Sequence, residues 1–225
     1  MSTIKSSSAN LTLNADGSGN DILFQSNASQ VGSLTAEGVL TATSFAGSGA
    51  SLTGIVGKQT IWIPANAMTP TESNGCAAIT AVETTAGRPD LYVLDFDKDA
   101  DEFAQFTVAF PKSWNLGTVT YQVFWSGLAS TDTVHWQFLG VAFGDNDTLD
   151  VVYGTPIVVT DNAQGAVEEM LVSAESSAVT IAGTPADDQL CYFKIGRDVS
   201  GDAMAGDARL HGVKIFYTTD ALNDA

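Results

Sequence analysis

The chain has 225 residues, of which 44% are hydrophobic and 16% charged, and its formal net charge is −17. This apolar content, which includes four Trp, is enough to build a core and excludes a chain that is disordered throughout. The negative charge would repel a phosphate backbone and an anionic membrane surface alike, so it disfavours nucleic-acid binding.

The composition of the chain changes near Lys58. Before this residue the sequence is rich in Ser and Gly, contains no Trp or Tyr, and has only Phe24 and Phe45 as aromatic residues. All four Trp and most strand-like patterns follow it. We therefore predict two parts, residues 1–57 and 58–225.

The first part contains short bursts of strand-forming residues, NLTL, DILFQ and GVLTATSF, without the charge and proline typical of disorder. Its large apolar side chains are too few to offset the conformational entropy lost if one copy is ordered alone. The alternatives are disorder and packing between chains. We favour packing between neighbouring chains.

The second part alternates apolar and polar residues with period two, which predicts short β-strands. In two examples the apolar residues of one face are Ala104, Phe106, Val108 and Phe110, then Val119, Tyr121, Val123 and Trp125. The other predicted strands are 60–63, 91–96, 134–143, 156–160, 169–174, 178–182, 190–195 and 210–217.

The segments between these strands carry turn residues, as in GDND at 144–147 and AGTPADD at 182–188. Helical spacing is nearly absent, and its best candidate is the short segment 163–171. We therefore predict an all-β chain, in which an extended, intertwined N-terminal stalk precedes an antiparallel β-sandwich head of jelly-roll type.

No segment predicts secretion or membrane insertion. The N-terminal residues lack the apolar core of a signal peptide, and no run approaches the ~20 apolar residues of a membrane span. We therefore expect synthesis in the cytoplasm, with any exterior location reached by another route. Cys76 and Cys191 fit neither a zinc set nor a redox pair, and we expect buried thiols rather than a disulfide.

The densest acidic cluster is DFDKDADEF, which includes Asp95, Asp97, Asp99 and Asp101. Carboxylates at alternate positions are typical of a calcium loop, but Ala100 stands where the loop needs Gly, and Phe106 stands where it needs Glu. The EF-hand interpretation therefore fails. A solvated turn is the favoured interpretation, and these four Asp remain weak candidates for a Ca²⁺ or Mg²⁺ site.

No catalytic arrangement can be identified in the sequence. The two histidines lie in predicted strands, without a Ser nucleophile elbow or a Cys–His motif, and neither Gly-x-Gly sequence precedes a helix. Further acidic residues lie in turns, where solvated carboxylates are common: Asp145, Asp147, Asp150, Asp187 and Asp188. We expect no enzyme activity and no cofactor. Among the tryptophans, Trp114 lies in the turn-like PKSWNLG and is the candidate for a surface contact.

The run TAEGVLTATSFAGSGASLTGI, residues 35–55, resembles shaft and connector segments of bacteriophage tail-fibre and other virion fibre proteins. Segments 58–70, 94–125 and 207–225 are similar to a C-terminal β module of phage and prophage structural proteins. The resemblance implies a homotrimeric fibre, spike or decoration protein, exposed on the virion surface and without enzymatic activity. It further implies that residues 1 to about 30 form an anchor or begin the stalk, and that three chains intertwine over 31–57. The expected trimer contacts are Leu40, Phe45, Leu52 and Ile55.

Three functions follow as expectations. A tail-associated fibre would contact a host surface glycan or protein. A head fibre or capsid decoration protein would bind another virion protein through its N-terminal segment. A glycan-binding or glycan-degrading tip protein would need a groove, and for degradation also clustered acids. The expected partners are further copies of the chain, other virion proteins and the host surface.

Overall fold

The computed structural model of the chain describes residues 22–26, 28–42, 57–167, 169–221 and 224. The chain separates into two compact units, Met1–Ser51 and Leu52–Ala225. The division predicted after residue 57 stays a prediction, because residues 43–56 lie outside the described residues. We call the part from Gly57 onward the head.

The N-terminal unit contains a three-stranded antiparallel sheet, which we call the N-terminal sheet. Its strands are β1 (Ile22–Ser26), β2 (Ser29–Leu34) and β3 (Leu40–Ala42), in the order β1-β2-β3. The turn before β3 is closed by Gly38, which has a φ of 83° and donates its N–H to the Thr35 carbonyl at 3.0 Å. Neither this turn nor the pairing of β1, β2 and β3 within one chain was predicted from the sequence.

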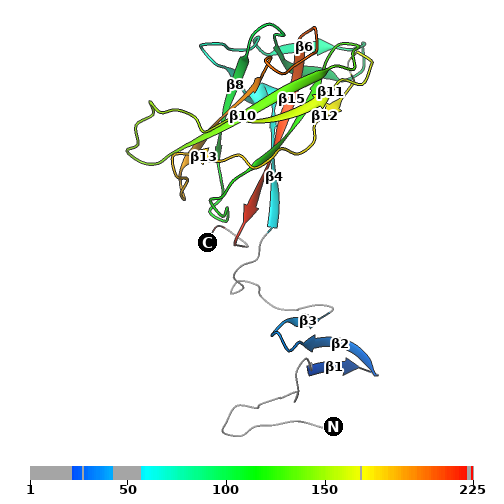
Figure 1. Ribbon diagram of the computed structural model, residues 1–225, viewed down its shortest axis with the longest axis vertical. Coiled ribbons are helices and arrows are strands. Elements are labelled where there is room, and N and C mark those ends of the chain that lie inside the picture. The colour runs from blue at the N-terminus through cyan, green and yellow to red at the C-terminus, as the bar shows by residue number, and fades with distance from the viewer. Residues whose placement is uncertain (1–21, 27, 43–56, 168, 222–223, 225) are drawn as a thin grey trace. The chain divides into compact units, whose positions relative to one another are not determined.

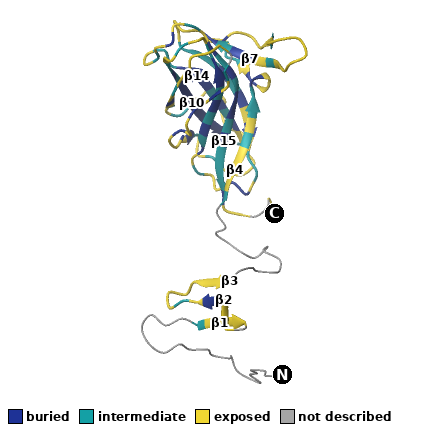
Figure 2. Ribbon diagram, turned by 90° about the vertical axis from the view of Figure 1, so that its right-hand side faces the viewer, coloured by how far each residue is buried: buried dark blue, intermediate teal, exposed yellow. Residues whose placement is uncertain are grey.

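The N-terminal sheet exposes its apolar side chains. Only Gly32 and Ser33 are buried in it, and Ser33 shares a hydrogen bond of 3.0 Å with Thr41. Figure 2 shows β1 and β3 mostly in the colour of exposed residues and part of β2 in that of buried ones. Among the described residues, the sheet therefore has no hydrophobic core.

The head is a sandwich of two six-stranded sheets (Figure 1). The first, which we call the β10 sheet, has the order β11-β10-β14-β8-β5, with β13 beside β10. Its strands are β5 (Thr69–Pro70), β8 (Glu102–Ala109), β10 (Thr133–Phe143), β11 (Ile157–Asn162), β13 (Ile181–Ala182) and β14 (Leu190–Arg197). All its pairings are antiparallel except that of β13 with β10.

The second sheet, which we call the β15 sheet, has the order β12-β9-β15-β7-β6, with β4 beside β15. Its strands are β4 (Gly57–Pro64), β6 (Thr80–Glu83), β7 (Asp90–Phe96), β9 (Thr120–Ser126), β12 (Leu171–Val172) and β15 (Ala208–Thr219). The prediction of an all-β, antiparallel head is confirmed.

The strand predictions differ from the structure mainly at short elements. Strands β5 and β6 were not predicted, and the strands predicted over 169–174 and 178–182 shorten to two residues each. The described residues of 163–171 are not helical, and a 3-10 turn, η1 (Ala65–Ala67), is the only helix in the described chain. No helix there is long and apolar enough to span a bilayer.

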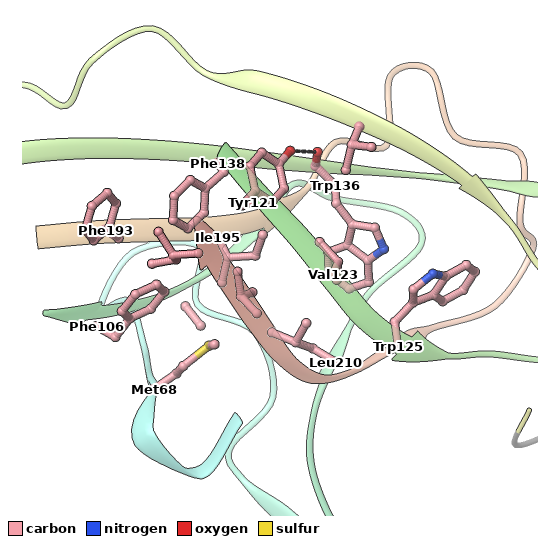
Figure 3. Close-up of a cluster of buried hydrophobic side chains, with 14 of the residues drawn as sticks. Met68, Phe106, Tyr121, Val123, Trp125, Trp136, Phe138, Phe193, Ile195 and Leu210 are labelled. Atoms are coloured by element: carbon pink, nitrogen blue, oxygen red, sulfur yellow. Dashed lines mark hydrogen bonds between the residues drawn. The ribbon is translucent and has the colours of Figure 1, made fainter. Parts of the chain in front are cut away.

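The head core is organised around stacked aromatic rings (Figure 3). Phe138 stacks on Tyr121 and on Phe193, with ring centroids 4.7 and 5.1 Å apart, and Phe193 stacks on Phe106 at 5.7 Å. The Tyr121 hydroxyl lies 2.7 Å from the Trp136 carbonyl oxygen. Because Tyr121 comes from the β15 sheet and the three Phe from the β10 sheet, the rings hold the two layers together.

A buried ion pair fixes the loop between β14 and β15. Arg197 donates to both carboxylate oxygens of Asp202, at 2.7 and 3.0 Å, and neither side chain is more than 3% exposed. The same guanidinium donates to the carbonyls of Phe96, Met204 and Gly206. Every Arg197 nitrogen is therefore paired, as a buried charge requires.

Replacing Asp202 with Ala should destabilise the head by about 3–5 kcal/mol, because the change leaves the Arg197 charge buried without its counterion. Urea unfolding followed by tryptophan fluorescence measures this difference. The matched control is Asp207→Ala, at an exposed position in the same loop, which should change stability by less than about 0.5 kcal/mol. Equal, small effects of both substitutions would contradict the role of the pair.

Candidate functional site

One candidate site is a hollow on the outer face of the β10 sheet, which we call the aromatic hollow. Its floor comes from three neighbouring strands, because cross-strand pairing aligns Gln105 with Lys194 and Tyr192 with Val141. Phe143, at the end of β10, meets the Tyr192 ring edge-on with centroids 5.6 Å apart. Phe193, between Tyr192 and Lys194, points to the opposite face and into the core.

The wall of the aromatic hollow is the segment that follows β10. This segment returns over the sheet, and Gly154 donates its N–H to the Gly140 carbonyl at 3.1 Å. The hollow has a volume of about 300 Å³ and is lined by Gln105, Val141, Phe143, Leu149, Val151, Tyr153 and Tyr192. Three of these side chains are aromatic, and three carry a polar group.

Lys194 lies at the edge of the aromatic hollow among aromatic rings. Its ammonium is 4.1 Å from the centroid of Phe103 and 5.1 Å from that of Tyr153. Burial lowers the pKa of Lys194 below its ordinary value and raises the pKa of Tyr153. The Lys194 ammonium forms no ion pair with a carboxylate of the described residues.

A second hollow, which we call the polar cleft, lies on the β15 sheet. It has a volume of about 390 Å³ and is lined by Asp95, Ser126, Gly127, Leu128, Val167, Gly206, Asp207 and Arg209. Cross-strand pairing places Asp95, Arg209 and Ser126 side by side, and the Arg209 guanidinium donates to Asp95 at 3.0 Å. The cleft thus combines a paired Asp–Arg with a hydroxyl.

His211 joins the polar cleft through a hydrogen bond of 2.9 Å between its Nε2 and the Ser126 hydroxyl. Burial and the Arg209 charge lower the pKa of His211, although Asp95 opposes this shift. The pair differs from a Ser nucleophile with its base in two respects. Ser126 is 2% exposed, and among the described residues no carboxylate hydrogen-bonds to the His211 ring.

Each of the four candidate metal ligands has a partner of its own in the structure. Asp95 accepts from Arg209, and Asp97 accepts the backbone N–H of Asp99 at 2.7 Å. Asp99 pairs with Lys98, whereas Asp101 accepts the N–H of Val199 at 2.9 Å. Within the described residues, no three His, Cys, Asp or Glu side chains form a group that could hold a metal ion. The structure therefore does not bring these ligands together.

The predicted surface contact at Trp114 is wrong. Trp114 is only 3% exposed and stacks on Phe110 with ring centroids 4.3 Å apart. The physical reason is a turn in which Trp114 donates its N–H to the Pro111 carbonyl at 2.9 Å, so that the ring folds back onto the core. Trp125, predicted on the apolar face of a strand, is buried, and so is Trp136. Trp62 is the exposed tryptophan, at 45%.

The four predicted trimer contacts can be placed only in part. Leu40 lies in β3 and is 54% exposed, so its side chain is available to another chain. Phe45, Leu52 and Ile55 lie outside the described residues. Their role in trimerisation stays a prediction.

The sequence analysis missed the aromatic hollow. Period-two alternation alone puts Tyr192 and Lys194 on one face of a strand, opposite Phe193. The positions of Tyr192 and Lys194 could therefore be predicted from the alternation. The position of Tyr153 could not, because it depends on where an irregular segment returns over the sheet.

The chain was compared with known proteins. No protein-family model matches it, and no curated protein matches it. Among solved structures it is similar to a family 28 carbohydrate-binding module specific for non-crystalline cellulose, with 13% identity, 69% of this chain and 86% of that chain covered, and a TM-score of 0.37.

Two further solved structures are similar to the chain. One is the family 11 carbohydrate-binding module of Clostridium thermocellum, in complex with a β-1,3-1,4-mixed-linked tetrasaccharide, with 9% identity, 75% and 90% coverage, and a TM-score of 0.36. The other is the enzymatically active domain of tailspike protein 4 of bacteriophage CBA120, with 11% identity, 70% and 19% coverage, and a TM-score of 0.32. At these TM-scores, no function is transferred to this chain.

Both cysteines are free and buried, which confirms the prediction for them. Burial raises the pKa of Cys76 to about 12, with a contribution from Glu102, and burial raises the pKa of Cys191 to about 11. Because the thiolate is the reactive form, neither thiol should react readily near neutral pH.

The folded protein at pH 8 should therefore gain no iodoacetamide adduct, whereas urea-unfolded protein should gain two, one on each cysteine. Mass spectrometry of the intact chain over time measures both. Rapid modification of the folded protein would contradict the burial of the thiols.

Proposed function

We propose that this chain is a non-enzymatic structural protein of a bacteriophage particle, a homotrimeric fibre or spike whose heads face outward and contact the host surface. The observation that carries the proposal is the N-terminal sheet, which leaves its large apolar side chains uncovered. The resemblance of residues 35–55 to phage fibre shafts supports the same function.

The N-terminal sheet supports assembly with further copies of the chain. Most of its large apolar side chains are exposed to a third or more of their area, as is Val39 in the turn before β3. The exposed strand residues are Leu23, Phe24, Val31, Leu34 and Leu40. A small sheet needs a covered apolar face to be stable. Identical chains related by symmetry present identical apolar faces. In a trimer, the apolar side chains of each sheet would therefore be buried against those of the other two copies.

The head supports a binding rather than a catalytic role. The polar cleft contains the Ser126–His211 pair. The neighbouring carboxylate, Asp95, accepts a hydrogen bond from Arg209 and not from the His211 ring. We propose no catalytic residue and no cofactor. Three heads on one stalk would bind a repeated host surface glycan or protein multivalently, which strengthens weak individual contacts.

The N-terminal segment is proposed to attach the fibre to other virion proteins, which places the protein at the particle surface. Gold-labelled antibodies against the head, viewed on virions by electron microscopy, should mark the tail. Label on the capsid would favour a head fibre or decoration protein instead. Label on neither would contradict a virion protein.

Full-length protein should have the mass of a trimer in solution, and a chain that begins at Lys58 should be a weaker trimer or a monomer. The head has its own buried core, so the shortened chain should still fold. Light scattering coupled to size-exclusion chromatography measures both masses, and circular dichroism verifies the fold. A full-length monomer would contradict the proposal.

Leu40→Asp should weaken the full-length trimer, because the carboxylate would be buried in the contact between chains. The matched control is Val152→Asp, at a head position that is 85% exposed, which should leave the mass unchanged. Sedimentation over a concentration series measures the shift. Equal behaviour of the two variants would show that Leu40 lies outside the contact.

A further inference from the structure

Four polar side chains in the aromatic hollow or at its edge have no hydrogen-bond partner among the described residues. Gln105, Tyr153, Tyr192 and Lys194 make no side-chain hydrogen bond to another described residue. All four side chains are half-buried, so the surrounding atoms limit their access to water. Partly buried donors and acceptors that converge on an apolar surface are typical of a ligand site.

The walls of the hollow supply apolar contact at fixed geometry. Phe143 and Tyr192 are set edge to face at an interplanar angle of 85°, and the floor beneath them includes the buried Val141. Phe103 is held beside Lys194 because its ring lies over Gly196, where a Cβ would come within 2.4 Å of a ring carbon. The aromatic surfaces are therefore positioned before any ligand arrives, which reduces the entropy lost on binding.

Three ligand classes can be compared with this chemistry. A purely apolar group would leave the amide, two phenols and an ammonium unsatisfied, and each such group costs free energy. A polyphosphate would meet only one cation in a chain of net charge −17. A pyranose ring offers apolar C–H faces to the aromatic rings and hydroxyl groups to the polar ends, so it matches both kinds of surface.

We infer that the aromatic hollow binds a pyranose ring of a host surface glycan, with Tyr192, Tyr153 and Phe143 as apolar walls and Gln105 and Lys194 as hydrogen-bonding groups. The volume of about 300 Å³ lies at the lower end of small-molecule sites and suits one or two rings. This inference rests on the proposed adhesive function of the head and names the ligand class for it.

The ring can come from a neutral or an acidic glycan. With a neutral sugar, Lys194 donates to a hydroxyl oxygen. With a uronic or sialic acid, its ammonium pairs with the sugar carboxylate, for which the described residues provide no competitor. Both kinds of sugar would contact the aromatic walls and Gln105. Binding of an acidic sugar would depend more strongly on the Lys194 charge than binding of a neutral one.

Saturation-transfer NMR on the full-length protein tests the inference. The probes are neutral oligosaccharides of glucose, galactose, mannose and N-acetylglucosamine, and acidic ones of galacturonate and sialic acid. Calorimetry then gives the affinity of each probe that binds. Tyr192→Ala should weaken binding by about tenfold or more, because it removes a wall and a hydroxyl.

Gln105→Ala serves as a second variant, because it removes only a polar end and keeps the aromatic packing intact. Lys194→Met should weaken the binding of acidic probes more than the binding of neutral ones. The matched control is Tyr92→Ala, which removes an exposed tyrosine from β7 on the other sheet and should leave affinity unchanged. Circular dichroism of every variant verifies the fold.

Absence of binding by every probe at millimolar concentration would overturn the inference. So would unchanged affinity in folded Tyr192→Ala and Gln105→Ala, which would place the sugar elsewhere. A change of mass in Tyr192→Ala without sugar binding would also overturn it, because the occupant would then be a second copy. The trimer mass and the virion label are measured separately, so failure of the sugar site leaves the proposed fibre testable.

Discussion

The head depends on aromatic side chains buried between its two sheets. Phe106, Phe138 and Phe193 project inward from three adjacent strands, and Tyr121 meets them from the opposite sheet. The Tyr121 hydroxyl also donates to the backbone carbonyl oxygens of Trp136 and Ile157, so the ring stack is fixed to the backbone. Because these strands use their inward residues for the core, their outward residues, including Gln105 and Tyr192, are held on a rigid surface.

The two units of the chain differ in how they can become stable. The head contains a continuous core of its own, whereas the N-terminal sheet has strands and turns but little buried side-chain area. Backbone pairing specifies the conformation of β1, β2 and β3 without providing the apolar burial that normally offsets conformational entropy. An assembly that covers Leu40 and its neighbours would therefore stabilise the first unit without altering the second.

Much of the head could be predicted from the sequence, because period-two alternation reports directly which residues share a face. It identified Phe106, Tyr121 and Trp125 as inward residues, and all three are buried. It failed where pairing is short or the chain is irregular. The turn residues of PKSWNLG predict a surface position for Trp114, but its burial depends on how that turn folds over Phe110. The aromatic hollow was missed because Tyr153 reaches it through an irregular segment with no periodic signal.

Strand β15 pairs with β4, β7 and β9, and it follows all of them in the chain. A nascent polypeptide therefore cannot complete this sheet until residues 208–219 have left the ribosome. Until then, the edges of β4, β7 and β9 that pair with β15 have no partner strand. The N-terminal sheet, whose strands are close in sequence, is under no such delay. In the proposed fibre, neighbouring nascent chains would therefore associate through the N-terminal sheet before their heads are complete, which would couple the order of assembly to the order of translation.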